Sequence, residues 1–317
     1  MTDVAAVLTR EFSHRGVTSV TPVQQGNHKH TAIVAFSDGG TVVVQLSTDT
    51  ASLHLETALA RAVASRTSIP VPSVLSTGTV ADCGYAVVEH IRGRELHEEF
   101  VELELGAQRD IAASFGRGLA ELHDAFALDG YGAVTADPNG SGFEFQSGEA
   151  TDWNQWFSAY YSDGVDALPP VFDPLRDELT AALDRTELSA NPPSCLYPWD
   201  LRPGNALVDD EGIAAVLDWG GPLAAAPGLA VAKTEHLVAD WYVSGGTSLR
   251  RSFRDGYESV RPYPSVEPLY RVAAVLRSAV DSNGEVTRPG YPERTGSRAV
   301  SFHQQRLETT LANLSFN

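Results

Sequence analysis

Apolar residues follow two different patterns along this chain. Before residue 91 they form short runs rich in β-branched and aromatic side chains, which predict strands. An Asp-Gly-Gly turn at 38–40 separates two such runs and indicates a hairpin. Residues 52–66 differ, because their apolar side chains recur at helical spacing and predict one helix. The predicted strands lie at 20–25, 30–36, 36–46, 69–80 and 85–91.

After residue 93 the apolar spacing is mostly helical. A connector rich in Gly, Ser and Asp occupies 135–151, and two short apolar runs about an Asp-Asp-Glu-Gly turn in 206–219 predict a pair of strands among the helices. The predicted helices lie at 108–126, 152–161, 174–185, 230–243, 268–280 and 298–314.

The order of these elements predicts an α+β protein with two lobes. Residues 1–92 are expected to form a β-rich first lobe, an antiparallel sheet carrying one main helix. Residues 93–317 are expected to form a mostly helical second lobe, and the hinge is expected near Glu89 to Gly93. With 317 residues the chain is long enough for two such lobes.

The charge of the chain argues against nucleic acid as a partner and suggests a halophilic source. The formal net charge is -18, with no basic stripe, so the chain is not expected to bind nucleic acid. Lys29 and Lys233 are its only lysines among 23 cationic residues. Strong acidity with so little lysine suggests a halophilic protein, whose surface carboxylates keep it hydrated in high salt. An acidic surface therefore says nothing about a cationic substrate.

The chain is expected to be cytoplasmic. Cys83 and Cys195 are far apart without metal-ligand spacing, which is typical of reduced structural thiols. No apolar run approaches the ~18 residues of a membrane span, and the N-terminus does not resemble a signal peptide.

A segment between residues 195 and 222 concentrates oxygen-bearing side chains. Asp200 and Asn205 are separated by a stretch with a Pro-Gly pair, which excludes a regular helix and predicts a structured loop. Asp218 follows the second short apolar run and is expected at a strand end. One carboxylate and one amide oxygen, completed by water and phosphate, suit Mg²⁺. The other carboxylate can orient a hydroxyl and accept its proton, as phosphoryl transfer requires.

These residues carry a resemblance to a known family. "DLRPGNALVDD" followed by "VLDW" resembles the aminoglycoside phosphotransferase and choline kinase superfamily, small-molecule kinases with the protein-kinase fold. "FGRGLAELH" resembles the family's helix before the catalytic loop, and "PVPSVL" and "YAVVEHIRG" resemble its strands leading to the hinge. The resemblance implies a protein-kinase-like fold whose first lobe covers ATP and whose second lobe holds the catalytic loop and the acceptor.

The resemblance also implies roles for individual residues. Asp200 would be the catalytic base, and Asn205 and Asp218 would be the Mg²⁺ ligands. Glu56 would be the ion-pairing glutamate of the first lobe's helix, although it could instead be a solvated helix residue. The residues implied at the nucleotide are Gly26, Asn27 and Lys29 in the loop "GNHKH" above the phosphates, and Glu89, His90 and Ile91 at the adenine hinge.

The chain departs from the family's pattern at three places. Pro198 and Trp199 stand where the family usually has a His-Gly pair, so the entry to the catalytic loop must be repacked. Gln45 stands where these kinases carry the lysine or arginine that grips the α/β-phosphates; it can hydrogen-bond to phosphate but supplies no charge. "LAAAPGLA" lacks the acidic residues that often follow the metal-binding Asp.

Two basic residues are candidates to compensate. Lys29 lies in the turn expected above the phosphates, and we hypothesise that it provides the missing cation in place of Gln45. Arg202 could stabilise charge on the transferred phosphoryl group, because arginine matches phosphate oxygens. The alternatives are a solvated lysine in the turn and a structural ion pair of the arginine.

The sequence thus favours an ATP- and Mg²⁺-dependent kinase that phosphorylates a hydroxyl of a small molecule, bound between the catalytic loop and the helices after Thr151. A catalytically impaired kinase-fold protein that binds nucleotide or a partner is the alternative, supported by Gln45 and Trp199. A protein kinase is disfavoured, because no activation segment of the usual kind follows Asp218. The aromatic residues that could form a substrate wall or simply core are Trp153, Trp156, Tyr160 and Tyr161.

Overall fold

The computed structural model describes residues 2–23, 29–136, 145–146, 150–244 and 246–316. They fall into two compact units, each drawn from separate stretches of chain. The first unit is Met1–Arg94, Thr135–Phe145 and Ala206–Gly221, and the second is Glu95–Val134, Gln146–Asn205 and Pro222–Asn317. The expected lobes, 1–92 and 93–317, stay a prediction.

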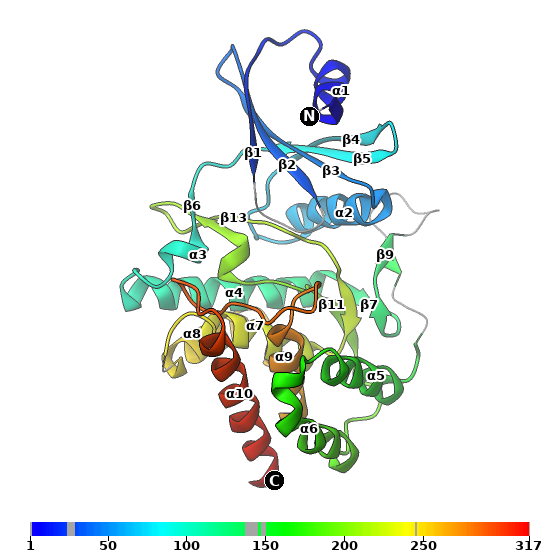
Figure 1. Cartoon of the computed structure of the whole chain (residues 1–317), viewed down its shortest axis with the longest axis vertical. Helices are drawn as coiled ribbons and strands as arrows, with labels where there is room; N and C mark the ends of the chain where they lie inside the picture. The colour runs from blue at the N-terminus through cyan, green and yellow to red at the C-terminus, as the bar shows by residue number, and fades with distance from the viewer. Residues whose placement is uncertain (1, 24–28, 137–144, 147–149, 245, 317) are drawn as a thin grey trace. The chain divides into compact units, whose positions relative to one another are not determined.

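A five-stranded antiparallel sheet is the main part of the first unit (Figure 1). Its strand order is β1-β2-β3-β5-β4, so β5 is inserted between β3 and β4. The short apolar runs of the sequence predicted these strands, and β1 begins ahead of the expected residue 20. The strands are β1 (Val17–Val23), β2 (His30–Phe36), β3 (Thr41–Ser47), β4 (Val74–Val80) and β5 (Cys83–Glu89).

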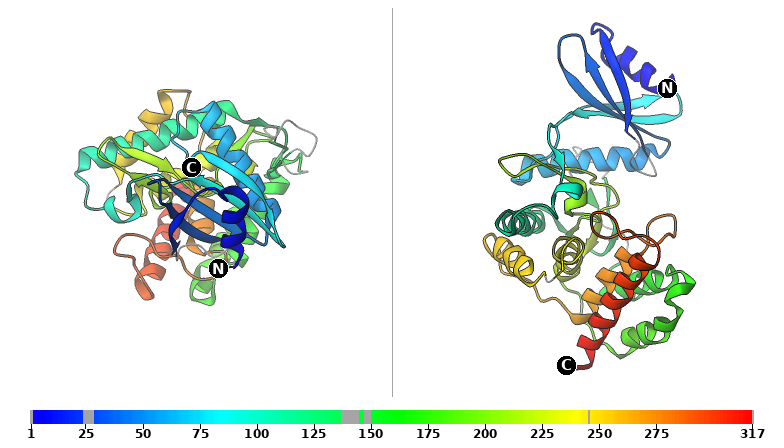
Figure 2. Two further views of the ribbon diagram at one scale, coloured as in Figure 1. Left: turned by 90° about the horizontal axis from the view of Figure 1, so that it is seen from above. Right: turned by 60° about the vertical axis from the view of Figure 1, so that its left-hand side comes forward.

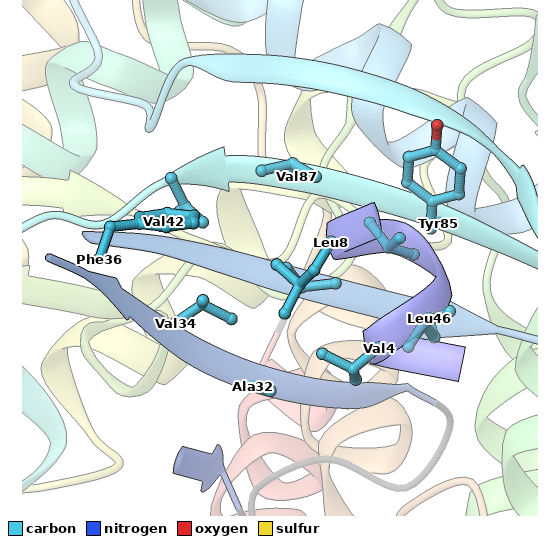
Figure 3. Close-up of a cluster of buried hydrophobic side chains, with 11 residues drawn as sticks. Val4, Leu8, Ala32, Val34, Phe36, Val42, Leu46, Tyr85 and Val87 are labelled. Atoms are coloured by element: carbon cyan, nitrogen blue, oxygen red, sulfur yellow. The ribbon is translucent and has the colours of Figure 1, made fainter. Parts of the chain in front are cut away.

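The helix α1 (Thr2–Glu11) packs on one face of this sheet, an element that the sequence analysis did not anticipate (Figure 3). Side chains alternate between the faces of a strand, so every second residue of β2 and β3 points toward α1. The resulting cluster consists of Val4, Val7, Leu8, Ala32, Val34, Phe36, Val42, Val44, Leu46, Tyr85 and Val87.

The helix α2 (Thr50–Arg66) contacts β3, β4 and β5 and was predicted from its apolar spacing. The carboxylate of Asp49 accepts a hydrogen bond from the backbone N–H of Ser52 and caps its first turn. Leu53, Leu59 and Val63 are buried. This packing fixes the rotation of α2 about its axis, and hence the direction of the remaining side chains.

The stretch 206–221 of the first unit is a β-hairpin, as the sequence predicted. β12 (Ala206–Val208) pairs antiparallel with β13 (Ile213–Val216), and the register sets Ala206 opposite Val216. The backbone N–H of Val216 donates to the carbonyl of Pro70, which ties the hairpin to the segment before β4. The unit also contains the short strand β9 (Thr135–Ala136), and the boundary between the units falls within β6 (Arg94–Glu95).

The second unit is mainly helical, with one small antiparallel sheet of order β7-β11-β14-β8. Its helices are α3 (Leu96–Glu99), α4 (Leu105–Ala125), α5 (Trp153–Asp166), α6 (Asp173–Arg185), α7 (Pro227–Ala239), α8 (Thr247–Glu258), α9 (Pro268–Ala279) and α10 (Ser297–Ala312), with three short 3-10 helices, η1 (Pro170–Phe172), η2 (Pro203–Asn205) and η3 (Asn313–Phe316). The strands of the sheet are β7 (Ala127–Leu128), β8 (Gly132–Ala133), β11 (Ser194–Tyr197) and β14 (Leu223–Ala225), and β10 (Phe145–Gln146) pairs with β9.

Buried ion pairs hold the C-terminal half of α7. Glu235 accepts from the Nη1 of Arg271 at 2.7 Å and from the hydroxyl of Tyr263 at 2.7 Å. Asp240, directly after the helix, is paired with both Arg250 and Arg306. A buried carboxylate is costly unless it is paired and hydrogen-bonded, and both conditions are met here. These contacts anchor α7, which passes through the core of the unit.

Helices α4 and α8 run side by side at close range (Figures 1 and 2). Glycine makes this approach possible, because a Cβ atom built on Gly116 would lie 1.9 Å from the carbonyl oxygen of Phe253. On the facing helix, a Cβ on Gly256 would lie 2.0 Å from the carbonyl oxygen of Ala113. Both contacts are with backbone, which cannot move aside as a side chain can.

Gly116→Ala is therefore expected to destabilise the protein by about 2–3 kcal/mol, the usual cost of overpacking a rigid contact. Chemical denaturation measures the loss of unfolding free energy. Gly106→Ala on the same helix is the matched control, because nothing lies within 4 Å of the added methyl group. The control is expected to be neutral or slightly stabilising. Equal stabilities for the two variants would contradict the close packing.

Candidate active site

The described part of the predicted nucleotide site in the first unit is centred on Lys29. Its Nζ donates to both carboxylate oxygens of Glu56, at 2.7 Å and 2.8 Å. It also lies 3.3 Å from Oδ1 of Asp218, at the end of the β-hairpin. Lys29 is thus not a solvated turn residue, and Glu56 is not a solvated helix residue. Three predicted site residues from distant parts of the chain are in direct contact.

The position of Lys29 follows from strand register. Gln45 on β3 pairs with Thr31 on β2, and Lys29 precedes Thr31 by two residues. Because side chains alternate, the lysine continues the face of the sheet that carries Gln45, opposite the face covered by α1. Lys29 therefore lies at the start of the neighbouring strand, on the same sheet face as Gln45. Gly26 and Asn27, also predicted at the phosphates, lie outside the described residues.

The charges of this cluster are coupled. Burial opposes the charged form of Lys29, but the carboxylates of Glu56 and Asp218 outweigh it and raise the pKa of the lysine. Burial also raises the pKa of Glu56, with Asp218 acting in the same direction and Lys29 against it. One ammonium facing two carboxylates leaves the ionised cluster with a net negative charge, which favours a cation nearby.

Asp218 has an unusual backbone conformation, with a positive φ of 59°, two residues after the end of β13. Aspartate tolerates this left-handed region better than most residues. The next residue, Trp219, is buried and donates from its indole to the carbonyl of Val216, which fixes the turn. The carboxylate of Asp218 is about half exposed, with 53% of the side chain accessible, so it remains open to a ligand.

The predicted hinge follows β5. Glu89 ends the strand, and its carboxylate accepts from the hydroxyl of Ser73 at 2.8 Å. His90 and Ile91 directly follow the strand and belong to no helix or strand. Their role at the adenine stays a prediction.

The predicted catalytic loop belongs to the second unit and encloses Asp200. Oδ2 of Asp200 accepts from Nε of Arg202 at 2.9 Å and from Nδ2 of Asn205 at 3.2 Å. Asn205 also donates to the backbone carbonyl of Asp200 at 2.9 Å. The nitrogen of the asparagine thus holds the loop, which leaves its side-chain oxygen as the atom available to a metal.

Arg202 has further support behind it. The hydroxyl of Tyr242 hydrogen-bonds to Arg202, and its pKa is raised to about 12 by burial, with Arg202 opposing. The same hydroxyl lies 2.9 Å from Nδ1 of His97. Arg202 makes an ion pair with Asp200, so its position is fixed beside the predicted base. Its expected role at the phosphoryl group stays a prediction.

Trp199, one of the departures from the family's pattern, is packed against cations. Nζ of Lys233 lies 3.3 Å from the centroid of its ring, and the guanidinium of Arg277 lies 5.3 Å from it. Lys233 is 2% exposed and comes from α7. Sequence reasoning missed both cations. The available signal was a lysine within the apolar run "LAVAKTEHLVA", in a chain with only two lysines.

The aromatic residues of α5 are mainly core. Trp153, Tyr160 and Tyr161 are buried, and the hydroxyl of Tyr160 contacts that of Tyr197 at 3.1 Å. Trp156 is partly exposed and stacks on Tyr160, with ring centroids 5.0 Å apart.

Two other kinds of feature, a metal-binding cluster and a membrane-spanning helix, were sought among the described residues. Among them, no group of three or more His, Cys, Asp or Glu side chains is placed to hold a metal ion. No helix in the described ranges has the length and apolar character to cross a membrane.

Comparison with known proteins defines the class. The profile of the phosphotransferase enzyme family matches residues 19–269, most of the chain, and the protein belongs to this family. It is therefore a small-molecule kinase or phosphotransferase, as the sequence motifs indicated. A search of the curated proteins finds no match.

Solved structures share the fold at low sequence identity. A thermostable mutant of the aminoglycoside phosphotransferase APH(4)-Ia, in a ternary complex with AMP-PNP and hygromycin B, is 18% identical over 100% of both chains, with a TM-score of 0.64. A proposed aminoglycoside phosphotransferase from Ralstonia eutropha is 16% identical, with 99% of this chain and 97% of that chain covered and a TM-score of 0.64. A proposed fructosamine-3-kinase from Thermobifida fusca is 18% identical over 100% of both chains, with a TM-score of 0.59. These likenesses confirm the predicted α+β, protein-kinase-like fold.

Proposed function

We propose that this protein transfers the γ-phosphate of ATP to a hydroxyl of a small molecule in a Mg²⁺-dependent reaction. The observation that carries the proposal is the cluster of Lys29, Glu56 and Asp218. A kinase needs a cation on the phosphates, a helix glutamate to hold that cation, and a carboxylate for the metal. This chain has all three groups, although its β3 position is occupied by Gln45.

The nucleotide is proposed to bind to the first unit. Lys29 donates to the phosphates, with Glu56 keeping it charged and oriented. Gly26 and Asn27 belong to the loop above the phosphates, and Gln45 adds a hydrogen bond without charge. The adenine edge pairs with the hinge residues Glu89, His90 and Ile91. The AMP-PNP bound by APH(4)-Ia is consistent with this role for the family's fold.

Mg²⁺ is proposed to be held by Asn205 and Asp218. The donor set of one amide oxygen and one carboxylate suits Mg²⁺, which keeps several water or phosphate oxygens. Both residues are close in sequence to one strand pair. Ala206 pairs with Val216, Asn205 directly precedes Ala206, and Asp218 is two residues after Val216. When bound, the metal neutralises charge on the phosphates.

Asp200 is proposed to be the base. It orients the acceptor hydroxyl and accepts its proton while the hydroxyl oxygen bonds to the γ-phosphorus. The bond from that phosphorus to the β–γ bridging oxygen breaks, and ADP leaves with the electron pair. Arg202 fixes the orientation of Asp200 and adds positive charge near the transferred group.

The proposal is tested by nucleotide binding and turnover measured side by side. We expect Mg²⁺-ATP to bind, and ADP to be released only when an acceptor hydroxyl and Mg²⁺ are both present, with EDTA abolishing turnover. A broad panel of sugars, amino alcohols and aminoglycosides searches for the acceptor. Binding without turnover across the whole panel would support the catalytically impaired alternative. Absence of nucleotide binding would refute the proposal and leave only the form of that alternative that binds a partner.

A further inference from the structure

Three aromatic rings and two cationic side chains of the second unit form a continuous series of contacts. Trp156 stacks on Tyr160, whose ring lies 4.7 Å from the guanidinium of Arg277. Arg277 also lies over Trp199, and Trp199 covers Lys233. We name these five residues the aromatic–cation ladder. It joins α5, α9, the catalytic loop and α7, and its member in the loop, Trp199, directly precedes Asp200.

The two cations of the ladder have no carboxylate partner. In the part of the chain that the structure describes, neither Lys233 nor Arg277 has an acidic side chain within ion-pair distance. The chain has 41 acidic residues against 23 basic ones, so carboxylates are abundant elsewhere. Lys233 and Arg277 lie beside a predicted catalytic loop, where Asp200 is the acidic group that acts on Lys233, and they add local positive charge to an otherwise acidic protein.

Burying Lys233 is costly for the fold. Burial lowers its pKa to about 7; Asp200 opposes this shift, while Arg277 and Arg202 add to it. A methionine would fill similar space without the loss of hydration. Structural packing alone therefore does not explain a lysine at this position, and a charge requirement does.

The exposed side of the ladder is the side that a ligand can reach. Trp156, Trp199 and Arg277 are each partly exposed, as is Asp200, whereas Tyr160 and Lys233 are buried. A molecule whose hydroxyl approaches Asp200 would meet the guanidinium of Arg277 and the ring of Trp199. Arginine pairs with carboxylate and phosphate oxygens through its planar fork.

We propose that the ladder selects an acceptor that carries an anionic group, a carboxylate or a phosphate, near the hydroxyl to be phosphorylated. Arg277 contacts the anion and Lys233 supplies positive charge from beneath Trp199. A polycationic aminoglycoside would be repelled by these two side chains. This inference rests on the proposed function, since it names the class of its acceptor. The phosphoryl-transfer step is unchanged: the hydroxyl proton goes to Asp200 and ADP is the leaving group.

Matched acceptor pairs test the charge requirement. Glycerate is compared with glycerol, glucose 6-phosphate with glucose, and kanamycin serves as the polycation. Binding of each probe is measured by calorimetry with and without Mg²⁺-AMP-PNP, and turnover with Mg²⁺-ATP. We expect at least one anionic probe to bind at least tenfold more tightly than its neutral partner. The two pairs distinguish a carboxylate from a phosphate acceptor.

Variants assign the effect to the ladder. Arg277→Gln is expected to weaken binding of the anionic probe at least tenfold while the affinity for Mg²⁺-AMP-PNP stays within twofold. Arg277→Lys should keep much of the binding. Arg251→Gln, an exposed arginine on α8, is the control and should change nothing.

Lys233→Met gives an independent readout. In the parent protein, anion binding is expected to weaken above pH 7, where Lys233 loses its charge. Lys233→Met should bind the anion more weakly than the parent protein below pH 7, and its binding should no longer fall above pH 7. The groups facing Lys233 are Asp200, Arg202, Arg277 and Tyr197. The same variant should unfold at a higher temperature at pH 6, because the buried charge is removed. A buried lysine whose pKa is lowered in the folded state destabilises the fold most below pH 7, and less as pH rises toward 10.5.

The outcomes are distinguishable. Equal binding of charged and neutral partners, or preference for kanamycin, would overturn the inference while nucleotide turnover could still support the kinase. No detectable binding of any anionic probe would overturn it as well. Tight anion binding lost in Arg277→Gln, together with absent Mg²⁺-AMP-PNP binding, would instead refute the proposed function and keep the anion site.

Discussion

Asp200→Asn is expected to lower kcat by about 10³-fold, within the range that general-base catalysis contributes. The asparagine side chain occupies the same volume, and its oxygen can still accept from Nε of Arg202, as Oδ2 of Asp200 does at 2.9 Å. It cannot take up the proton of the acceptor hydroxyl. Steady-state ADP release with the best acceptor measures the loss.

Two controls separate this loss from misfolding. The Kd for Mg²⁺-ATP should stay within about twofold, because Asp200 is assigned to the acceptor rather than to the nucleotide. Asp210→Asn should be neutral, since the side chain of Asp210 is 96% exposed on the hairpin of the first unit. A kcat for Asp200→Asn within threefold of the parent protein would remove Asp200 as the base.

Lys29→Met is expected to reduce kcat/KM for ATP by about 10²-fold. The ammonium contacts Glu56 at 2.7 Å and Asp218 at 3.3 Å, and its removal leaves two carboxylates without the cation between them. The phosphates then meet a more negative site, and the ion pair that orients the cation is lost. Initial rates at varied ATP concentration measure the effect.

The double variant with Lys29→Met and Gln45→Lys sharpens this test. Gln45 lies on the same sheet face as Lys29, across the β2–β3 pairing. A lysine at position 45 should therefore reach the same carboxylates. The double variant should have a kcat/KM at least tenfold higher than that of Lys29→Met alone. Gln45→Ala is the control and should reduce kcat/KM by less than fivefold. If Lys29→Met matches the parent protein, the lysine is not the phosphate cation.

Most elements were predictable because their signals are local. Alternation in β2 and β3, the turn between β12 and β13, and helical spacing in α4 are properties of adjacent residues. The helix α1 was missed although Val4, Val7 and Leu8 recur at helical spacing, because a segment of only ten residues is marginal as an isolated helix and is stabilised by packing on the sheet. Leu55, which has helical spacing with Leu59 and Val63, is only partly buried, whereas Leu53 is buried in the core.

Some residues of the candidate site could be predicted from local sequence, and others could not. Asp200, Asn205 and Asp218 could be named from their spacing and from the family resemblance. Lys29 was proposed from its rarity and its place in a turn, but its partner could not be known. Lys233 stood out only as a lysine within an apolar run, and no local pattern could assign it Trp199 as a neighbour.

The sequence by itself determined the fold class, the phosphotransferase family and the segments that carry acidic and amide oxygens, since these depend on residue type and short-range spacing. Only the tertiary structure decided that Lys29 pairs with Glu56 and Asp218 and that Trp199 lies between two cations. Those contacts join residues as far apart as Lys29 and Asp218, 189 positions along the chain. Their geometry is set by strand register and helix packing, which arise when the whole core is formed.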